Sequence, residues 1–201
     1  MNFSQALQEQ RWDDHRYYHH SRINQSLHLV SALSFIASYA LIYTHPAVAV
    51  MIAWLVAMPS RQLGHFFFEP KDYDHANHAT HEYKESVKVG YNLFRKVVLL
   101  SIWIGSPLLL LLDPALFGLL TAAAHWSGLL DNIAIMWLAL AVGAVVFRTI
   151  QLFFLKDVQT GLVWCVKILT DPFHDLKLYF RAPLYVLRGE LFDPIVTEDA
   201  T

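Results

Sequence analysis

Four long apolar stretches, separated by polar segments, dominate the pattern of this chain. They run over Leu27–Tyr43, Pro46–Met58, Val97–Leu112 and Ile133–Phe147. Each is shorter than the roughly 20 residues that cross a bilayer as a helix, but aromatic and weakly polar residues at their ends can extend them. We therefore predict an all-α fold, a multi-pass transmembrane helical bundle with about four membrane helices.

Turn signals set the arrangement of these helices. The tripeptide Thr44–Pro46 forms a tight turn, so the first two apolar helices are expected to be antiparallel neighbours. Ser106-Pro107 interrupts the third stretch and predicts a kink. After Arg148, apolar residues alternate with charged ones, which is typical of amphipathic helices that lie in the membrane interface.

The composition fits a membrane protein. Hydrophobic residues make up 55% of the 201 residues and charged residues only 16%, whereas soluble domains carry about 25% charged residues. A net charge of −2 gives no basic excess for nucleic acid. The single cysteine, Cys165, excludes a disulfide framework and a thiolate-rich metal site.

The basic residues indicate an orientation. All fifteen Lys and Arg residues lie in segments 11–22, 61–96 and 148–188, and such residues gather on the cytoplasmic side of membrane proteins. We predict an integral protein of a bacterial inner membrane or the endoplasmic reticulum, with both termini and loop 59–96 in the cytoplasm. We expect a single membrane domain over 1–201, comprising an N-terminal cytoplasmic segment (1–26), the membrane core (27–147) and an interfacial C-terminal segment (148–201).

Nine of the eleven histidines fall on the predicted cytoplasmic side. His28 begins the first helix and His65 follows the second, so the hairpin brings both imidazoles to the same membrane edge. Asn24 precedes His28 by four residues, and Gln62 and Glu69 flank His65 at helical spacing. Amides and carboxylates at these positions can orient histidine ligands by accepting their free N–H groups.

The loop after the second helix adds further candidate ligands. His75, His78 and His81 are spaced by three, and Glu82 and Glu85 follow at helical spacing. Imidazole and carboxylate groups without sulfur suit iron, manganese or zinc, and Fe(II) is the expected ion if the chemistry is oxidative.

Two motifs carry a family resemblance. The segment Tyr18–His28 resembles the YH-x4-N-x3-H signature of the 2-hydroxy fatty acid dioxygenase family, and Gln62–Glu69 resembles its second signature, Q-x-GH-x3-E. Pro59 stands where the family usually has tryptophan. The resemblance implies a small membrane enzyme of fatty acid alpha-oxidation, which uses Fe(II) and O2 to shorten a 2-hydroxy fatty acyl substrate by one carbon.

The resemblance and the histidine pattern together give the candidate site. The motif histidines are His19, His28 and His65, and the flanking polar positions are the candidate catalytic residues. Arg22 or Arg61 is a candidate partner for the substrate carboxylate. The expected metal ligands are His19, His28, His65, His78 and His81, and the expected catalytic residues are Asn24, Gln62 and Glu69.

Two other interpretations remain open at the level of sequence. His15-x3-His19-His20 and His78-x2-His81 resemble the histidine boxes of di-iron fatty acyl hydroxylases and desaturases. A non-enzymatic protein is the other alternative: His28 and His65 as axial ligands of a haem, or a lipid-binding protein in which the loop histidines have no chemical role.

Overall fold

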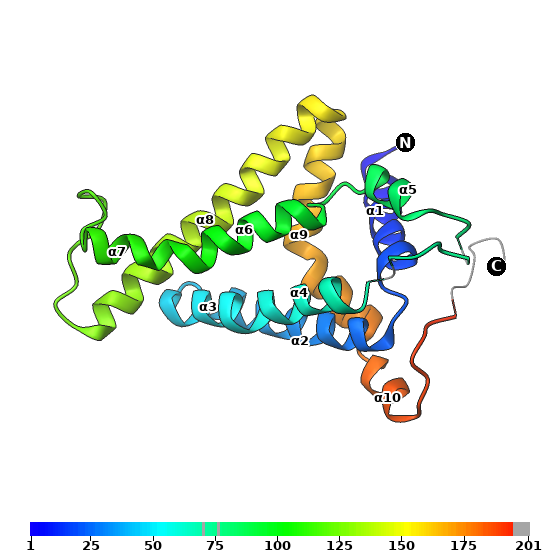
Figure 1. Cartoon of the computed structure of the whole chain (residues 1–201), viewed down its shortest axis with the longest axis horizontal. Coiled ribbons are helices and arrows are strands. Elements are labelled where there is room, and N and C mark those ends of the chain that lie inside the picture. Colours follow the sequence, from blue (N-terminus) through cyan, green and yellow to red (C-terminus); the bar gives the residue numbers. More distant parts are fainter. Residues whose placement is uncertain (70, 76, 195–201) are drawn as a thin grey trace.

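The computed structural model describes residues 1–69, 71–75 and 77–194, and in this part of the chain the regular structure is helical (Figure 1). Its only extended pairings are two isolated bridges, Ser21 with Phe192 and Asp74 with Ala79. The predicted all-α fold is confirmed.

The chain begins with two helices joined at a sharp corner. Helix α1 (Phe3–Tyr18) starts with a capping box between Asn2 and Gln5, which satisfies backbone N–H groups that would otherwise lack partners. Helix α2 (Arg22–Leu41) starts at Ser21, whose side chain accepts from the Asn24 backbone N–H. A capped start to each helix confines the bend to residues 19–21.

The predicted hairpin is present. Leu41 carbonyl oxygen accepts from Thr44 and His45, and the chain returns antiparallel along α2 as α3 (Pro46–Ile52), a π-helical turn (Ala53–Ala57) and α4 (Met58–Phe67) (Figure 1). Pro59 near the start of α4 has no N–H to donate to the preceding turn. The π-helical turn lies immediately before this proline and belongs to a class of bulge frequently found at functional sites.

The third apolar stretch is broken where the proline predicts. After α5 (His81–Val87), helix α6 (Leu93–Gly105) leads into a 3-10 turn (Ser106–Leu108) and the short α7 (Leu109–Leu112). Pro107 lies within that turn, as expected for a residue that removes a helical hydrogen bond.

The C-terminal part is more integrated into the bundle than its amphipathic pattern indicates. Helix α8 (Trp126–Leu155) continues beyond the predicted end at Phe147, and α9 (Val158–Tyr179) folds back to pack against α1, α2 and α8. Helix α10 (Ala182–Leu187) contacts α2. The polar face of α9 is buried inside the protein, while apolar residues such as Leu162 and Phe173 are exposed.

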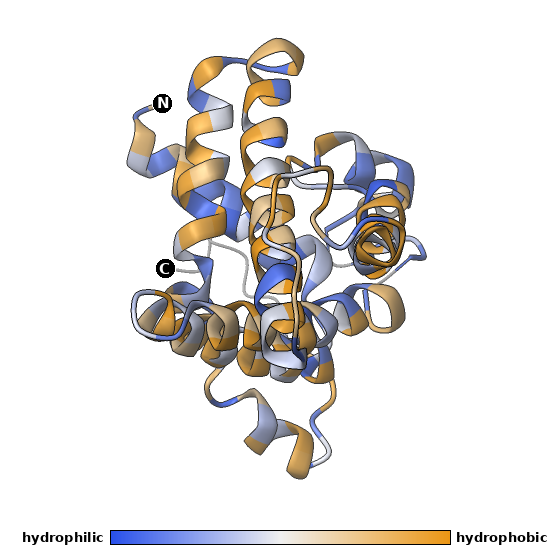
Figure 2. Cartoon of the chain, turned by 90° about the vertical axis from the view of Figure 1, so that its left-hand side faces the viewer, coloured by the Kyte–Doolittle hydropathy of each residue, from blue (hydrophilic) through white to orange (hydrophobic). Residues whose placement is uncertain are grey.

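Three of the predicted apolar stretches lie in helices long and apolar enough to cross a membrane: Pro46–Phe67, Phe94–Leu112 and Trp126–Leu155. These helices show largely apolar ribbons in Figure 2. The first stretch, Leu27–Tyr43, falls in α2, which is not among them because its first two turns are polar. The loop predicted to begin at 59 begins only after Phe67, since α4 continues the second helix.

The larger of two buried apolar clusters lies away from α1; the smaller one includes Tyr17 and Tyr18 of α1. Val50, Trp103, Ala134 and Trp137 form a buried cluster contributed by α3, α6 and α8. Trp54 stacks on Trp103 with ring centroids 5.0 Å apart. This packing fixes one end of the three apolar helices and leaves the opposite end for the histidines.

Candidate metal centre

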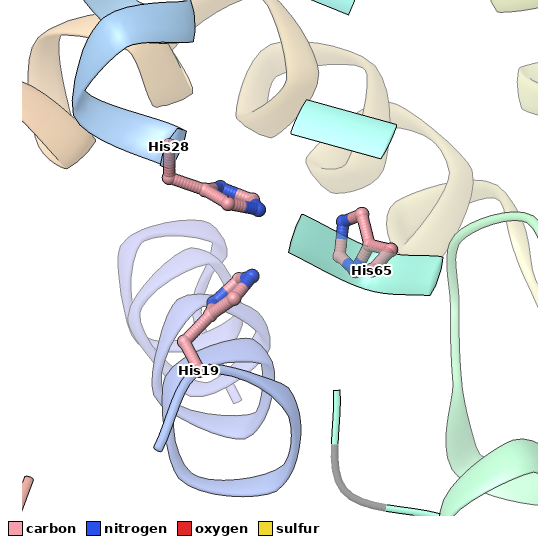
Figure 3. Close-up of side chains that lie close together, drawn as sticks. All are labelled: His19, His28 and His65. Carbon is pink, nitrogen blue, oxygen red and sulfur yellow. The ribbon is translucent and has the colours of Figure 1, made fainter. Parts of the chain in front are cut away.

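His19, His28 and His65 converge in a buried cluster (Figure 3). They come from the C-terminal cap of α1, the second turn of α2 and the last turn of α4. The ring centroids are 4.1 Å apart for His19–His28, 5.5 Å for His19–His65 and 5.0 Å for His28–His65. One potential ligand atom from each ring lies within 4.8 Å of the other two.

Two amides of α2 hold His19 in place. Asn24 Nδ2 donates to the Tyr18 carbonyl at 2.9 Å, and Gln25 Nε2 donates to the His19 carbonyl at 2.8 Å. Both side chains are fully buried. Their hydrogen bonds fasten the α1–α2 corner to the face of α2 that carries His28, so Asn24 positions a ligand through the backbone and makes no hydrogen bond to a histidine ring.

Close contact between α2 and α4 depends on Gly64. A Cβ at this position would lie 3.1 Å from Asn24 Cγ and 3.4 Å from His28 Cδ2. The first distance is too short for packing without movement, and the neighbouring His65 sits on the same buried turn. Glycine thus lets the two ligand-bearing helices approach closely enough for their imidazoles to meet.

Each of the three rings has a polar group beside its Nδ1 atom. His65 Nδ1 is 2.8 Å from Glu69 Oε2, whose other oxygen accepts from Lys88 Nζ at 2.9 Å. His19 Nδ1 is 3.2 Å from the Tyr179 hydroxyl, whereas His28 Nδ1 is 3.6 Å from Asp175 Oδ2 and makes no hydrogen bond with a described residue. A group that accepts from Nδ1–H leaves Nε2 deprotonated, the tautomer that a metal-binding histidine requires.

The Nε2 atoms of His19 and His28 are buried and have no hydrogen-bond partner among the described residues. An unpaired polar atom in the interior is costly, and a metal ion would satisfy both. Burial lowers the pKa of His19 well below its ordinary value, which keeps the ring neutral and its lone pair free for a ligand bond. The donor set of three neutral imidazoles fits Zn²⁺ or Fe²⁺ with open positions.

Helix α9 supplies groups that the sequence pattern did not reveal. One face of α9 carries four buried polar residues at intervals of four: Lys167, Asp171, Asp175 and Tyr179. The helix packs against α1 and α2, and Asp175 pairs with Arg61 of α4. Lys167 pairs with Asp14 and with Asp171. Polar residues at intervals of four in an otherwise apolar helix indicate a shared polar face. Only the tertiary packing shows that this face borders the histidines.

Both arginines proposed as carboxylate partners already have acidic partners in the protein. Arg61 Nη1 is 2.9 Å from Asp175 Oδ2 and Nη2 is 3.8 Å from Asp171 Oδ2. Arg22 Nη2 is 2.7 Å from Asp193 Oδ1, and its guanidinium stacks over Tyr185. Arg22 therefore ties the C-terminal segment to α2, and Arg61 ties α4 to α9.

The loop histidines lie apart from the cluster. His78 is exposed with a positive φ of 48°, and His81 is half-buried as the first residue of α5. The group of potential ligands found among the described residues contains neither of them. Gln62, in contrast, stands one turn before His65, and its Oε1 atom is buried without a hydrogen-bond partner in the described structure.

A cavity of about 670 Å³ adjoins the cluster and is lined by His65 but by neither of the other two histidines. Its wall also includes Gln62 and Arg61, and further along the same helix Trp54 and Val50. The cavity is thus polar near His65 and apolar towards the tryptophan cluster. Its volume is in the range of sites that bind small molecules.

Comparisons with known proteins returned no relative for this arrangement. A scan of protein-family models, a search of curated proteins and a search of solved structures each found no match. The site itself consists of three buried imidazoles beside a cavity of about 670 Å³. His19 and His28 have unpaired ring nitrogens among the described residues, and His19 and His65 have a hydrogen-bonding group at Nδ1.

Proposed function

We propose that this protein is an Fe(II)-dependent membrane dioxygenase that acts on 2-hydroxy fatty acids. One 2-hydroxy acid and one O2 would yield the acid one carbon shorter, carbon dioxide and water, with cleavage of the bond between C1 and C2. The observation that carries the proposal is the buried cluster of His19, His28 and His65 beside an apolar cavity.

The histidine cluster supports a single metal ion. Two nitrogens bound to one ion lie at most about 4 Å apart, because each metal–nitrogen bond is about 2.1 Å long, so small ring movements suffice from the observed spacing. The bound ion would supply the redox chemistry with O2. The protein would supply neutral ligands, a water-poor site and the orientation of the substrate.

The arrangement of the histidines favours one non-haem metal ion over a di-iron site or a haem. His15, His78 and His81, which a di-iron site would need, are not in the group of converging ligands. The centroid of the His28 ring is 4.1 Å from that of His19 and 5.0 Å from that of His65. These short separations leave no space for a haem between the two axial candidates.

The cavity supports an acyl substrate. It follows the helix from Val50 to His65, fifteen residues that correspond to about 22 Å of helix. Each methylene buried there contributes about 0.8 kcal/mol. A fatty acid that enters tail first would place its carboxyl end beside the histidines, at the membrane edge that we propose faces the cytoplasm.

Metal analysis and a product assay test the proposal together. The purified protein should retain about one iron per chain and lack the sharp visible absorption of haem. Iron-loaded protein with 2-hydroxypalmitate and O2 should release pentadecanoate. A hydroxylated product from palmitate itself would favour the hydroxylase interpretation, and tightly held zinc with no oxygen consumption would refute the oxygenase.

A further inference from the structure

The wall of the cavity beside His65 contains one basic residue that forms no ion pair with a described acidic residue. Four basic residues line it: Arg61, Lys88, Lys96 and Lys167. Arg61 pairs with Asp175, Lys88 with Glu69 and Glu85, and Lys167 with Asp14 and Asp171. Among the described residues, Lys96 has no carboxylate within ion-pair distance.

The two acidic residues of the same wall form ion pairs with residues other than Lys96. Asp13 pairs with Arg16 at 2.7 Å, and Asp14 pairs with Lys167. Lys96 is therefore the basic residue of the cavity wall that has no carboxylate partner at ion-pair distance among the described residues. An ammonium in such a place requires an anion or water.

Lys96 also stands at the correct end of the cavity. It lies in the first turn of α6, while Trp103, seven residues and about 10 Å further along the helix, lines the apolar end. Glu69, which hydrogen bonds to His65, and Arg61 are among the charged groups that interact with Lys96 electrostatically. The ammonium thus belongs to the surroundings of the histidine cluster.

We propose that Lys96 is the residue that binds the carboxylate of a long-chain fatty acid whose tail fills the cavity. This inference rests on the proposed function for the identity of the acyl chain and replaces Arg22 and Arg61 as the expected carboxylate partners, because both have acidic partners within the protein. A carboxylate headgroup would give Lys96 the ion-pair partner that no described residue supplies.

Gln62 has an unpaired amide oxygen that could bind the 2-hydroxyl group of the substrate. Its Oε1 atom is buried, has no hydrogen-bond partner in the described structure, and belongs to a side chain that lines the cavity one turn from His65. Lys96 offers N–H donors for the carboxylate and Gln62 offers an acceptor for the hydroxyl. Together they complement a 2-hydroxy carboxylate.

The test measures ligand binding without metal, so it does not depend on turnover. Full-length protein, treated with chelator and held in phosphatidylcholine nanodiscs, is titrated with the fluorescent fatty acid cis-parinarate. Palmitate, 2-hydroxypalmitate, palmitamide and a lysophosphatidate with the same chain then compete for the site. Lys96→Met should weaken both carboxylates roughly 10- to 100-fold, the size expected for a lost charged hydrogen bond, and leave palmitamide unchanged.

Three companion variants sharpen the result. Lys96→Arg should retain most of the carboxylate affinity, and Lys156→Met, which removes an exposed lysine outside the cavity wall, should change nothing. Gln62→Leu should remove the preference for 2-hydroxypalmitate over palmitate and spare palmitate itself.

Several outcomes would overturn the inference. These are unchanged carboxylate binding in Lys96→Met, equal losses of carboxylate and amide, or a lysophosphatidate that binds far more tightly than the fatty acids. If binding behaves as expected but iron-loaded protein releases no pentadecanoate, the carboxylate site stands and the proposed oxygenase fails. If pentadecanoate forms while Lys96→Met binds carboxylates normally, the proposed oxygenase stands and the carboxylate site at Lys96 fails.

Discussion

The two ends of the bundle bury different kinds of side chain: one end buries apolar rings, and the other buries histidines and charged groups. We call the cluster of Val50, Trp54, Trp103 and Trp137 the tryptophan end, and the region around His19, His28, His65, Asp171 and Asp175 the histidine end. The span Pro46–Phe67 contributes to both, with Trp54 in its first half and His65 near its close. A single helix therefore passes from an apolar environment to a buried polar one.

At the tryptophan end, most polar atoms have partners. Trp54 Nε1 donates to the Trp137 carbonyl at 3.1 Å, and Trp137 Nε1 donates to the Trp103 carbonyl at 3.3 Å; the Trp103 indole N–H alone has none. At the histidine end, ring nitrogens of His19 and His28 lack partners in the described structure. Buried polar groups in folded proteins normally have partners, so the unpaired nitrogens at the histidine end make it the candidate ligand site.

The largest expected effect is the loss of bound metal when a histidine of the cluster is replaced. His28→Ala removes one of the three candidate ligands and should abolish metal retention, because the remaining two imidazoles would leave a bound ion accessible to water. His45→Ala, at the far turn, should retain the wild-type metal content. Metal analysis of both purified variants provides the measurement, and full iron occupancy in His28→Ala would refute the three-histidine centre.

A substitution at the tryptophan end should affect stability and spare the metal. Trp137→Ala empties a buried position in the cluster and should reduce the free energy of unfolding by about 3–5 kcal/mol. Thermal unfolding of the detergent-solubilised protein measures this loss, while iron per folded chain should stay at the wild-type value. Loss of metal equal to that of His28→Ala would mean that the two ends are not separable.

Gly64→Ala tests the close contact between the ligand-bearing helices. The added methyl group collides with the Asn24 side chain and touches the His28 ring, so we expect a destabilisation of about 1–3 kcal/mol and weaker metal binding. Gly143→Ala is the matched control, because nothing lies within 4 Å of a Cβ there, and helix propensity should leave it neutral or slightly more stable. Equal metal affinity in both variants would argue against a role for the contact.

The smallest effect concerns orientation of one ligand. Glu69→Gln keeps the size of the side chain but weakens the acceptor for His65 Nδ1–H, so metal affinity should fall roughly 10- to 100-fold. Competition against a chelator measures the change. Glu85→Gln, which also removes a partner of Lys88 but contacts no site histidine, should bind metal like the wild type.

The local patterns of the chain predicted much of the site. The tight turn at Thr44–Pro46 and the positions of His28 and His65 on either side of it indicated that these rings would meet, because antiparallel helices joined by a short turn bring their far ends together. The spacing of His65 and Glu69 likewise predicted neighbours on one helical face. Both are short-range consequences of helix geometry.

Other groups could not be placed in this way. His78 and His81 share the residue type and spacing of ligands, yet the loop holds them away from the cluster. The four-residue spacing of Asp175 and Tyr179 indicates a shared helical face but not what that face contacts. They border His28 and His19 because α9 folds back over α2. The ion pairs that neutralise Arg22 and Arg61 join residues more than one hundred positions apart.

The sequence by itself determined that the chain is an all-helical bundle with apolar spans and that at least two motif histidines share one end of a helical hairpin, since hydrophobic periodicity and turn residues act over a few neighbours. Only the tertiary structure decided which histidine completes the cluster, which arginines are already paired and which lysine is left for a ligand. Those outcomes depend on helices distant in sequence that pack together, and on the requirement that every charge buried between them find a partner.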